Sequence, residues 1–403
     1  MTGRHAGGAG AGAGAPEVLD TADLELPVML LHDEAVDHNV RVMAEWCRNA
    51  GVQLAPHAKT HMSRDLVRRQ AAAGAWGFTA ATTAQVRTLA GWGVPRVLHA
   101  NVLVDRAAIA WVATTLLRAG AATEYLCYVD SEAGLDLLLD ELARHATARP
   151  LPLLLELGFP GGRTGVRDDV AALALARRVA SSPYVRLAGV ATFEGLMPAS
   201  ADVGVPRGAV DLLARVRALV TAVTDEDLVA GVPVVTAGGS SYFDLVVREL
   251  GPALWDRPVT TVLRSGCYVT HDHGVYRRTS PLGADRGDAS LRPAFELRAS
   301  VLSAPEDGRV VVGFGRREVP TDDRLPVVLG TVASDLDVSA WEVTGVNDHH
   351  AFVRVPAGVA ASVAPGTVLR FGISHPCGAF DRWRHLPLVD ADDRVVGEIT
   401  PQL

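Results

Sequence analysis

The chain has 403 residues, 48% of them hydrophobic, and a formal net charge of −8 at neutral pH. That length suits one large domain with a smaller one, or two domains of intermediate size. Acidic and basic residues are interspersed, which disfavours nucleic acid or an anionic membrane as a partner, so we expect a small-molecule ligand.

Residues 1–24 are predicted to be a flexible tail and lead-in. Residues 6–15 (AGGAGAGAGA) form a low-complexity Gly/Ala stretch, which is typical of a disordered segment. The segment lacks the basic-then-apolar profile of a signal peptide, and no apolar run is long enough to span a bilayer. Because the four cysteines are few and far apart, we expect a reducing compartment, the cytoplasm.

From residue 25 to 280, short apolar runs alternate with segments of helical periodicity. The predicted strands are Val28–His32, Gln53–Lys59, Gly77–Ala81, Arg96–Asn101, Glu124–Asp130, Leu151–Leu157, Leu187–Phe193, Pro233–Ala237 and Thr260–Leu263. The predicted helices include Ser63–Ala73, Ala107–Ala119, Glu132–Ala146 and Asp168–Ser181. Closely spaced β-then-α units imply parallel strands with helical crossovers. Eight or nine of them favour a (β/α)₈ TIM barrel over an open doubly wound sheet.

Residues 281–403 are predicted to form a C-terminal β-rich domain. The strands expected there are Phe295–Leu302, Val310–Gly313, Val327–Gly330, Ala351–Val355, Val368–Ile373 and Arg394–Thr400. Turns separate them, with little helix, so the α/β pattern ends near this boundary.

Lysine occurs once, at Lys59, beside 37 arginines. A guanidinium stays protonated and cannot form an imine, whereas a lysine amine can lose its proton and attack a carbonyl group. The stretch Pro56-His57-Ala58-Lys59-Thr60-His61 ends the second predicted strand, where barrel active sites are built. We therefore predict that Lys59 is catalytic, with His57 on the same side, and that His61 has a packing or supporting role.

Two glycine turns follow the last two predicted barrel strands, in Thr236–Ser241 and Arg264–Tyr268. Glycines allow close backbone approach, and amides with Ser/Thr hydroxyls can hold a phosphate. Barrels often bind phosphate after their late strands. The predicted cofactor-binding residues in these turns are Thr236, Gly238, Gly239, Ser240, Ser265, Gly266 and Cys267.

A candidate metal site lies in Ser374-His375-Pro376-Cys377, after a predicted strand. Residues two apart in an extended segment project to one face, and imidazole nitrogen with thiolate sulfur suits zinc. We predict His375 and Cys377 as ligands of Zn²⁺ or another divalent metal. A third ligand is left open, with His271, His273, His349 and His350 as candidates.

Together these motifs resemble the fold-type III pyridoxal 5'-phosphate (PLP) enzymes of the D-serine dehydratase and D-threonine aldolase group, relatives of alanine racemase. The resemblance runs from about residue 25 to the C-terminus. It implies that Lys59 binds PLP as an imine with His57 nearby, and that Arg163, in the loop Gly161–Gly165, approaches the cofactor's phenolic oxygen. It also implies that the glycine turns bind the phosphate and that the enzyme is a homodimer.

Two further features indicate the branch of the family, and a third departs from the family pattern. His-x-Cys is similar to the zinc-dependent dehydratase branch, whereas the aldolase branch tends to carry His-x-Asp. Asp381–Arg384 (DRWR) also resembles the amino-acid deaminase branch. Phe193 departs from the family, because many relatives have Tyr there, near the pyridine ring; its role, or a place as an ordinary core aromatic, stays open.

The expected function is a PLP- and zinc-dependent dehydratase (deaminase) for a β-hydroxy-D-amino acid such as D-serine or D-threonine, giving a 2-oxo acid and ammonia. A metal-dependent D-threonine-type aldolase, giving glycine and an aldehyde, would use the same residues. A non-catalytic PLP-binding protein is disfavoured by the β domain and the metal pair. An aldolase working without PLP would not need the glycine turns.

Overall fold

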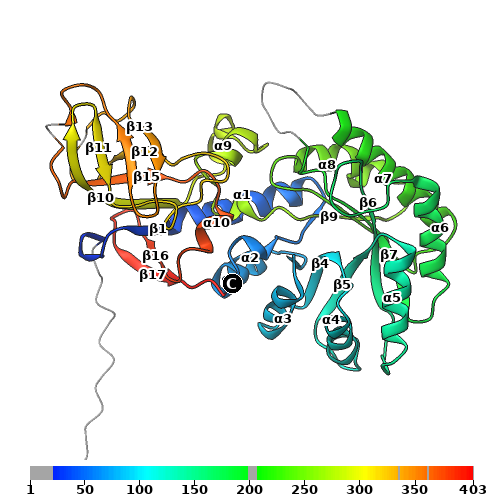
Figure 1. Cartoon of the computed structure of the whole chain (residues 1–403). Coiled ribbons are helices and arrows are strands. Elements are labelled where there is room, and N and C mark those ends of the chain that lie inside the picture. Colours follow the sequence, from blue (N-terminus) through cyan, green and yellow to red (C-terminus); the bar gives the residue numbers. More distant parts are fainter. Residues whose placement is uncertain (1–20, 198–206, 335, 361–362, 403) are drawn as a thin grey trace, which may run out of the picture.

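The structure is a computed structural model that describes residues 21–197, 207–334, 336–360 and 363–402. A barrel of alternating strands and helices lies beside a β-rich domain, with short helices between them (Figure 1). The stretch 6–15, predicted as part of a tail, lies outside the described residues. In the described part of the chain, no helix is both long and apolar enough to cross a membrane.

Eight parallel strands form the barrel sheet, in the order β2-β9-β8-β7-β6-β5-β4-β3. They are β2 (Gln53–Leu54), β3 (Phe78–Ala80), β4 (Arg96–Val102), β5 (Glu124–Val129), β6 (Leu151–Leu157), β7 (Val185–Thr192), β8 (Val234–Ala237) and β9 (Thr260–Leu263). The two outer strands meet through a parallel bridge between His57 and Thr79, just beyond β2. The predicted eight-stranded (β/α) architecture is confirmed.

Helices alternate with the barrel strands and cover the sheet. They are α1 (Asp33–Asn49), α2 (Arg64–Ala72), α3 (Thr83–Gly91), α4 (Arg106–Trp111), which continues into the π-helix η3 (Val112–Leu116), α5 (Glu132–Leu142), α6 (Asp169–Ala180), α7 (Arg207–Asp225) and α8 (Phe243–Leu250). Several begin where a short polar side chain accepts a hydrogen bond from the amide three residues on, which fixes the helix start. These N-caps are Ser63, Thr82, Asp105, Ser131 and Asp168.

The predicted β-rich domain is also confirmed. Its strands are β10 (Phe295–Glu306), β11 (Arg309–Val312), β12 (Val327–Thr331), β13 (Glu342–Val346), β14 (Ala351–Arg354), β15 (Val368–Gly372), β16 (Leu386–Val389) and β17 (Val395–Ile399). The short helices α9 (Val275–Thr279) and α10 (Cys377–Phe380) lie between this sheet and the barrel (Figure 1). The sequence did not predict β13 and β16.

One predicted strand belongs to the other domain. β1 (Val28–His32) pairs antiparallel with β10 and parallel with β16, so it lies in the β-domain sheet, although the sequence placed it in the barrel. Four of its five residues are buried. A short run that is apolar on both faces indicates a buried strand without indicating which sheet takes it. The next element, α1, returns the chain to the barrel.

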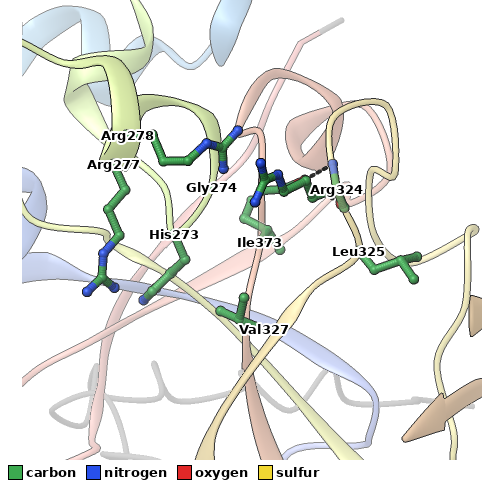
Figure 2. A pocket seen from close by; sticks show the side chains of 9 residues that line it. His273, Gly274, Arg277, Arg278, Arg324, Leu325, Val327 and Ile373 are labelled. Carbon is green, nitrogen blue, oxygen red and sulfur yellow. Dashed lines mark hydrogen bonds between the residues drawn. The ribbon is translucent and has the colours of Figure 1, made fainter. Parts of the chain in front are cut away.

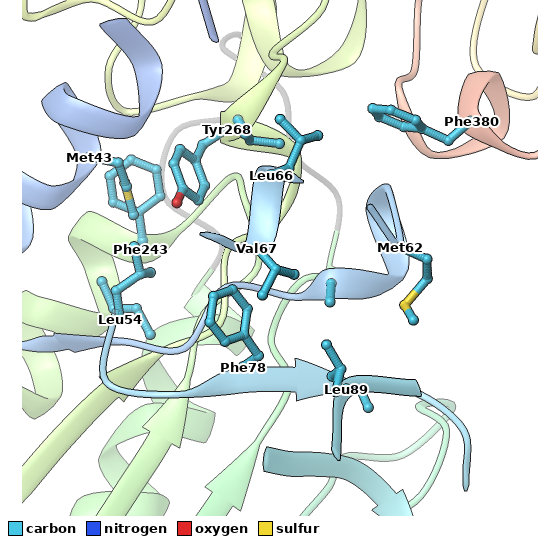
Figure 3. Close-up of a cluster of buried hydrophobic side chains, with 14 of the residues drawn as sticks. Met43, Leu54, Met62, Leu66, Val67, Phe78, Leu89, Phe243, Tyr268 and Phe380 are labelled. Atoms are coloured by element: carbon cyan, nitrogen blue, oxygen red, sulfur yellow. The ribbon is translucent and has the colours of Figure 1, made fainter. Parts of the chain in front are cut away.

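A continuous buried core connects the two domains beneath the segment that carries Lys59. Figure 3 shows part of it, including Leu54 of β2, Phe78 of β3 and Phe380 of α10. The Phe380 ring packs against Phe295 of β10, with centroids 4.9 Å apart. α10 also packs against the 3₁₀ turn η2 (Ala58–Thr60), so the core sets the β domain directly against the lysine segment.

Candidate active site

A cavity of about 620 Å³ opens at the C-terminal ends of the barrel strands and is lined by residues from both domains. Most of the residues predicted from sequence line it: His57, Lys59, Arg163, Gly238, Gly239, Ser240, Gly266, Cys267, His375 and Cys377. Thr236 and Ser265 do not. Lining residues that the sequence analysis did not assign include Thr60, Tyr128, Glu156, Arg264, Tyr276 and Asp381.

The lysine segment is held by tight backbone packing. β2 ends at Leu54, and Lys59 lies in η2 rather than in a continuing strand. A Cβ on Gly266 would lie 2.6 Å from the carbonyl oxygen of His57 and 2.8 Å from Oγ1 of Thr60, so only glycine fits there. This close approach fixes η2 while the Lys59 side chain stays exposed to the cavity.

The two histidines beside Lys59 have different surroundings. Burial, and then the positive charges of Lys59 and Arg264, hold the pKa of His57 well below its usual value, so its ring is neutral. Its Nδ1 is buried and, among the described residues, has no hydrogen-bond partner. His61 is fully buried, with Nε2 3.2 Å from Oε1 of Gln70 and Nδ1 accepting the Ser63 amide at 3.0 Å. The supporting role predicted for His61 is confirmed.

The loop after β6 is organised by an arginine that the sequence analysis did not assign. The guanidinium of Arg167 donates to the backbone carbonyls of all four residues from Gly162 to Gly165. The Gly165 amide donates to Asp130 at 3.0 Å. Arg163 projects from this loop over the ring of Phe193, with its guanidinium carbon 4.5 Å from the centroid. Phe193 therefore lines the cavity beneath a cation and is not a plain core aromatic.

The first glycine turn donates its amides to a carboxylate. Fully buried Glu194 accepts the Gly238 amide at 3.0 Å and the Gly239 amide at 2.8 Å. These two amides were predicted to bind a phosphate. In this structure they donate to the Glu194 carboxylate instead, and these hydrogen bonds set the conformation of the turn. Gly238 has φ +102°, a backbone conformation that favours glycine.

The side chains of Thr236 and Ser265 hydrogen-bond to backbone carbonyls in and near the glycine turns. The Thr236 hydroxyl donates to the Val262 carbonyl at 2.9 Å, and the Ser265 hydroxyl donates to the Gly239 carbonyl at 2.9 Å. Neither residue lines the cavity, although Thr236 Oγ1 accepts a hydrogen bond from Arg264, which does. Their predicted contact with the cofactor therefore stays a prediction.

The cavity floor fits a polar aromatic cofactor such as PLP. Buried Arg264 donates to Oγ1 of Thr236 at 2.6 Å and to the Thr192 carbonyl at 2.5 Å, while its guanidinium lines the cavity. Tyr128 Oη and Glu156 Oε2 also reach it, buried and without partners among the described residues. Burial raises the pKa of Glu156. Buried polar atoms without partners are uncommon, so these donors and acceptors are suited to a bound ligand.

Three soft ligand atoms meet on the β-domain side of the cavity. Cys267, His375 and Cys377 place their ligand atoms within 4.8 Å of one another, and the two sulfurs are 3.4 Å apart. Cys267 comes from the second glycine turn, and its side chain joins this cluster. None of His271, His273, His349 and His350 belongs to it. His375 and Cys377 meet across a turn into α10, not along a strand as predicted.

The pKa shifts in this cluster are those expected where negative charge gathers, as it does at a cation site. Burial disfavours charge on His375, but Cys267 and Asp322 outweigh it and raise its pKa to about 9. The hydrogen bond from Cys267 lowers the pKa of Cys377 against its burial. One imidazole and two thiols form the donor set that zinc prefers over magnesium or manganese, so these residues fit the metal predicted from sequence.

A second cavity, of about 340 Å³, lies beside α9 and is lined by three arginines (Figure 2). Arg278 pairs there with Asp323 at 3.1 Å, and Arg277 and Arg324 complete the set. Of the site motifs and candidate ligands named from the sequence, only the candidate metal ligand His273 and Ser374, beside His375, line this cavity.

Comparison with known proteins gives similarity over nearly the whole chain. Residues 294–389 match the family model described as "Putative serine dehydratase domain". D-threonine aldolase from Arthrobacter sp. is 28% identical over 383 residues, covering 94% of this chain and 92% of that protein. D-threo-3-hydroxyaspartate dehydratase from Delftia sp. is 24% identical, covering 92% and 96%.

Solved structures have the same fold. The crystal structure of D-threonine aldolase from Filomicrobium marinum has a TM-score of 0.78 at 23% identity, covering 96% of this chain and 97% of that one. D-threo-3-hydroxyaspartate dehydratase from Delftia sp. HT23 has a TM-score of 0.75 at 23% identity, covering 95% and 98%. Alanine racemases share the architecture, for example the Corynebacterium glutamicum enzyme at a TM-score of 0.60 and 18% identity, covering 89% and 97%.

Proposed function

We propose that the chain is a fold-type III PLP enzyme, and that it is a zinc-dependent lyase that deaminates a β-hydroxy-D-amino acid to a 2-oxo acid and ammonia. The observation that carries this proposal is the shared cavity of Lys59, His375 and Cys377. An amine able to form an imine and a set of metal ligands face the same space. The matched relatives include D-threonine aldolase, 3-hydroxy-D-aspartate aldolases and D-threo-3-hydroxyaspartate dehydratase, and they support a D-amino-acid lyase.

PLP, when bound, would delocalise the negative charge left on Cα after a proton is removed. Lys59 would hold the cofactor, and its freed amine, exposed in the cavity, would take the Cα proton. Arg163 and Arg264 would contribute positive charge on either side of the cavity floor. Because His57 is neutral, it would add no further positive charge beside the Lys59 amine.

Zinc, when bound by His375 and Cys377, would act as a Lewis acid on the β-hydroxyl group and make it a better leaving group. Loss of the Cα proton and of the hydroxyl as water leaves an enamine. The enamine becomes an imine and hydrolyses to the 2-oxo acid and ammonia. The cluster and Lys59 line the same cavity, which supports having both steps on one substrate.

A second candidate is the aldol cleavage, which gives glycine and an aldehyde. Its support is that D-threonine aldolase matches over 94% of this chain. The ligand set favours elimination, because Cys377 stands where the aldolase branch tends to carry Asp. Aldol cleavage also needs a base for the β-hydroxyl proton.

The test is to incubate the protein, purified with PLP and zinc, with D-serine, D-threonine and 3-hydroxy-D-aspartate, using the L-isomers as controls. Oxo acid, ammonia, glycine and aldehyde are measured together, with and without a chelator. Oxo acid from D-isomers alone, lost on chelation, is expected. Glycine with aldehyde would instead assign the aldolase, and no product with any D-isomer would contradict the proposed function.

A homodimer and a cytoplasmic location belong to the same proposal, since the family resemblance and the cysteine usage imply them. Light scattering of the purified protein after gel filtration tests the dimer by its mass. Fractionation of the source cells tests the location.

A further inference from the structure

We propose that Cys267 is the third protein ligand of the metal, so that the barrel and the β domain bind one ion in a Cys₂His site. This inference deepens the proposed function and rests on one part of it, the metal at His375 and Cys377. The sequence had placed Cys267 in the phosphate turn. Its side chain instead joins the ligand cluster.

The distances fit a tetrahedral ion. Zinc–sulfur bonds of about 2.3 Å at the tetrahedral angle separate two thiolates by about 3.8 Å. Cys267 and Cys377 have their sulfurs 3.4 Å apart, so a small movement admits zinc. A disulfide would require about 2.05 Å, and both cysteines are free. The separation therefore matches two ligands of one ion.

The position of Cys267 is built into the fold. It follows Gly266, whose lack of a side chain lets this turn contact the lysine segment. Only 5% of Cys267 is exposed. Thr60 lies beside both thiols, with Oγ1 3.8 Å from the Cys267 sulfur and 3.6 Å from the Cys377 sulfur. Ligands on a packed turn need little rearrangement to bind an ion.

Three protein ligands also suit a catalytic ion. Zinc in enzymes commonly keeps a fourth position for water or substrate. All three side chains line the cavity that contains Lys59, so the open position would face the substrate's β-hydroxyl. Two thiolates would balance the charge of Zn²⁺ and select against magnesium and manganese, which prefer oxygen ligands. The inferred metal site would therefore carry no net charge and would have soft ligands.

The experiment uses the full-length PLP-loaded protein and compares wild type with Cys267→Ser, Cys377→Ser and, as a buried control outside the cluster, Cys47→Ala. Zinc stoichiometry and affinity are measured by mass spectrometry of metals and by chelator competition. We expect Cys267→Ser to weaken zinc binding at least tenfold, about 1.4 kcal/mol, and Cys47→Ala to leave it unchanged. Cobalt substitution should give a thiolate charge-transfer band that falls by about half in either serine variant.

A second measurement needs no variant. Alkylation of native wild type, mapped by peptide mass spectrometry, should modify Cys267 and Cys377 together after chelation, and zinc should protect both. Wild-type zinc affinity in Cys267→Ser, or alkylation of Cys267 at an equal rate with and without zinc, would overturn the proposal. If zinc still binds wild type and chelation still abolishes activity, the proposed function survives that result. If wild type binds no zinc, both fail.

Discussion

Nδ1 of His375 lies 2.6 Å from Oδ2 of Asp322, a residue 53 positions earlier in the chain. This hydrogen bond leaves Nε2 of His375 for the ligand cluster. It sets the orientation of the ring and, for the proposed metal, would make the imidazole a stronger ligand, as carboxylates do beside metal-binding histidines. Asp322 is thus a positioning residue that sequence motifs did not indicate, because it lies in a loop with no signature of its own.

Replacing Asp322 with Asn should weaken metal binding by about 10- to 100-fold, since the imidazole loses its carboxylate partner. Chelator competition on the purified protein measures the effect. Asp323→Asn is the matched control, because that neighbouring carboxylate pairs with Arg278 instead. Equal metal affinity in the two variants would show that Asp322 does not position the ligand.

Lys59 should be the only residue labelled when the PLP-loaded protein is reduced with borohydride. The chain has no other lysine, so peptide mapping should find one cofactor per chain on the peptide containing residue 59. Lys59→Arg keeps the charge but cannot form an imine, and it should lose the visible absorbance band. A band that persists in Lys59→Arg would exclude Lys59 as the cofactor's attachment point.

Arg167→Gln should raise the PLP concentration needed for half-saturation on the order of tenfold. The side chain of Arg167 donates to four carbonyls of the loop that carries Arg163, and hydrogen bonds from a charged donor each contribute about 1.5–3 kcal/mol. Titration of PLP by absorbance tests this. Arg178→Gln changes an arginine that pairs with surface carboxylates and should leave the titration unchanged. If the PLP titration of Arg167→Gln matched that of wild type, the prediction would be wrong and Arg167 would not support the cofactor site.

Glu296→Gln should destabilise the fold by about 3 kcal/mol at neutral pH, because buried Arg298 and partly exposed Arg370 each lose a carboxylate partner. Only 1% of Glu296 is exposed, and it accepts hydrogen bonds from Arg298 at 2.7 Å and Arg370 at 2.6 Å. Urea unfolding measures the difference. Glu306→Gln, on the same strand but exposed, should change stability by less than about 0.5 kcal/mol.

The Glu296 effect should depend on pH in one direction. Burial alone would raise the pKa of Glu296, but His32, Arg370 and Arg298 outweigh it and hold the pKa well below its usual range. The unfolded chain therefore binds a proton first as pH falls through about 4.3. The stabilisation is present above that pH and is lost below it, so the difference between wild type and Glu296→Gln should shrink in acid. A difference constant down to pH 2 would contradict this assignment.

The barrel could be predicted because its signal is local and repeated. Leu151–Leu157 and Thr260–Leu263 were predicted at the bounds that the structure has, since each is a short apolar run between polar turns. β13 and β16 were missed, because Glu342–Val346 alternates weakly and Leu386–Val389 contains a proline. Strands at the edge of a sheet or with few residues leave little pattern to find.

The candidate site was predictable where a motif carries its own chemistry. A single lysine and a His-x-Cys pair can be recognised as site residues from their residue types alone. The roles of Arg264, Glu194 and Asp322 could not be predicted this way, because they depend on partners 28 to 72 residues away. Cys267 was predicted as a cofactor-binding residue because it follows Gly266. Only the fold shows that its sulfur lies close to that of Cys377.

The pairing of β1 makes the barrel an insertion within the β domain. Val28–His32 hydrogen-bonds with β10 and β16, whose residues come more than 250 positions later. During synthesis β1 must therefore wait unpaired until nearly the whole chain has emerged, and contacts so distant in sequence form slowly. A fragment cut at residue 281 would lack an interior strand and leave two strand edges open to aggregation. The two domains are structurally distinct, but the β domain is not a separable unit.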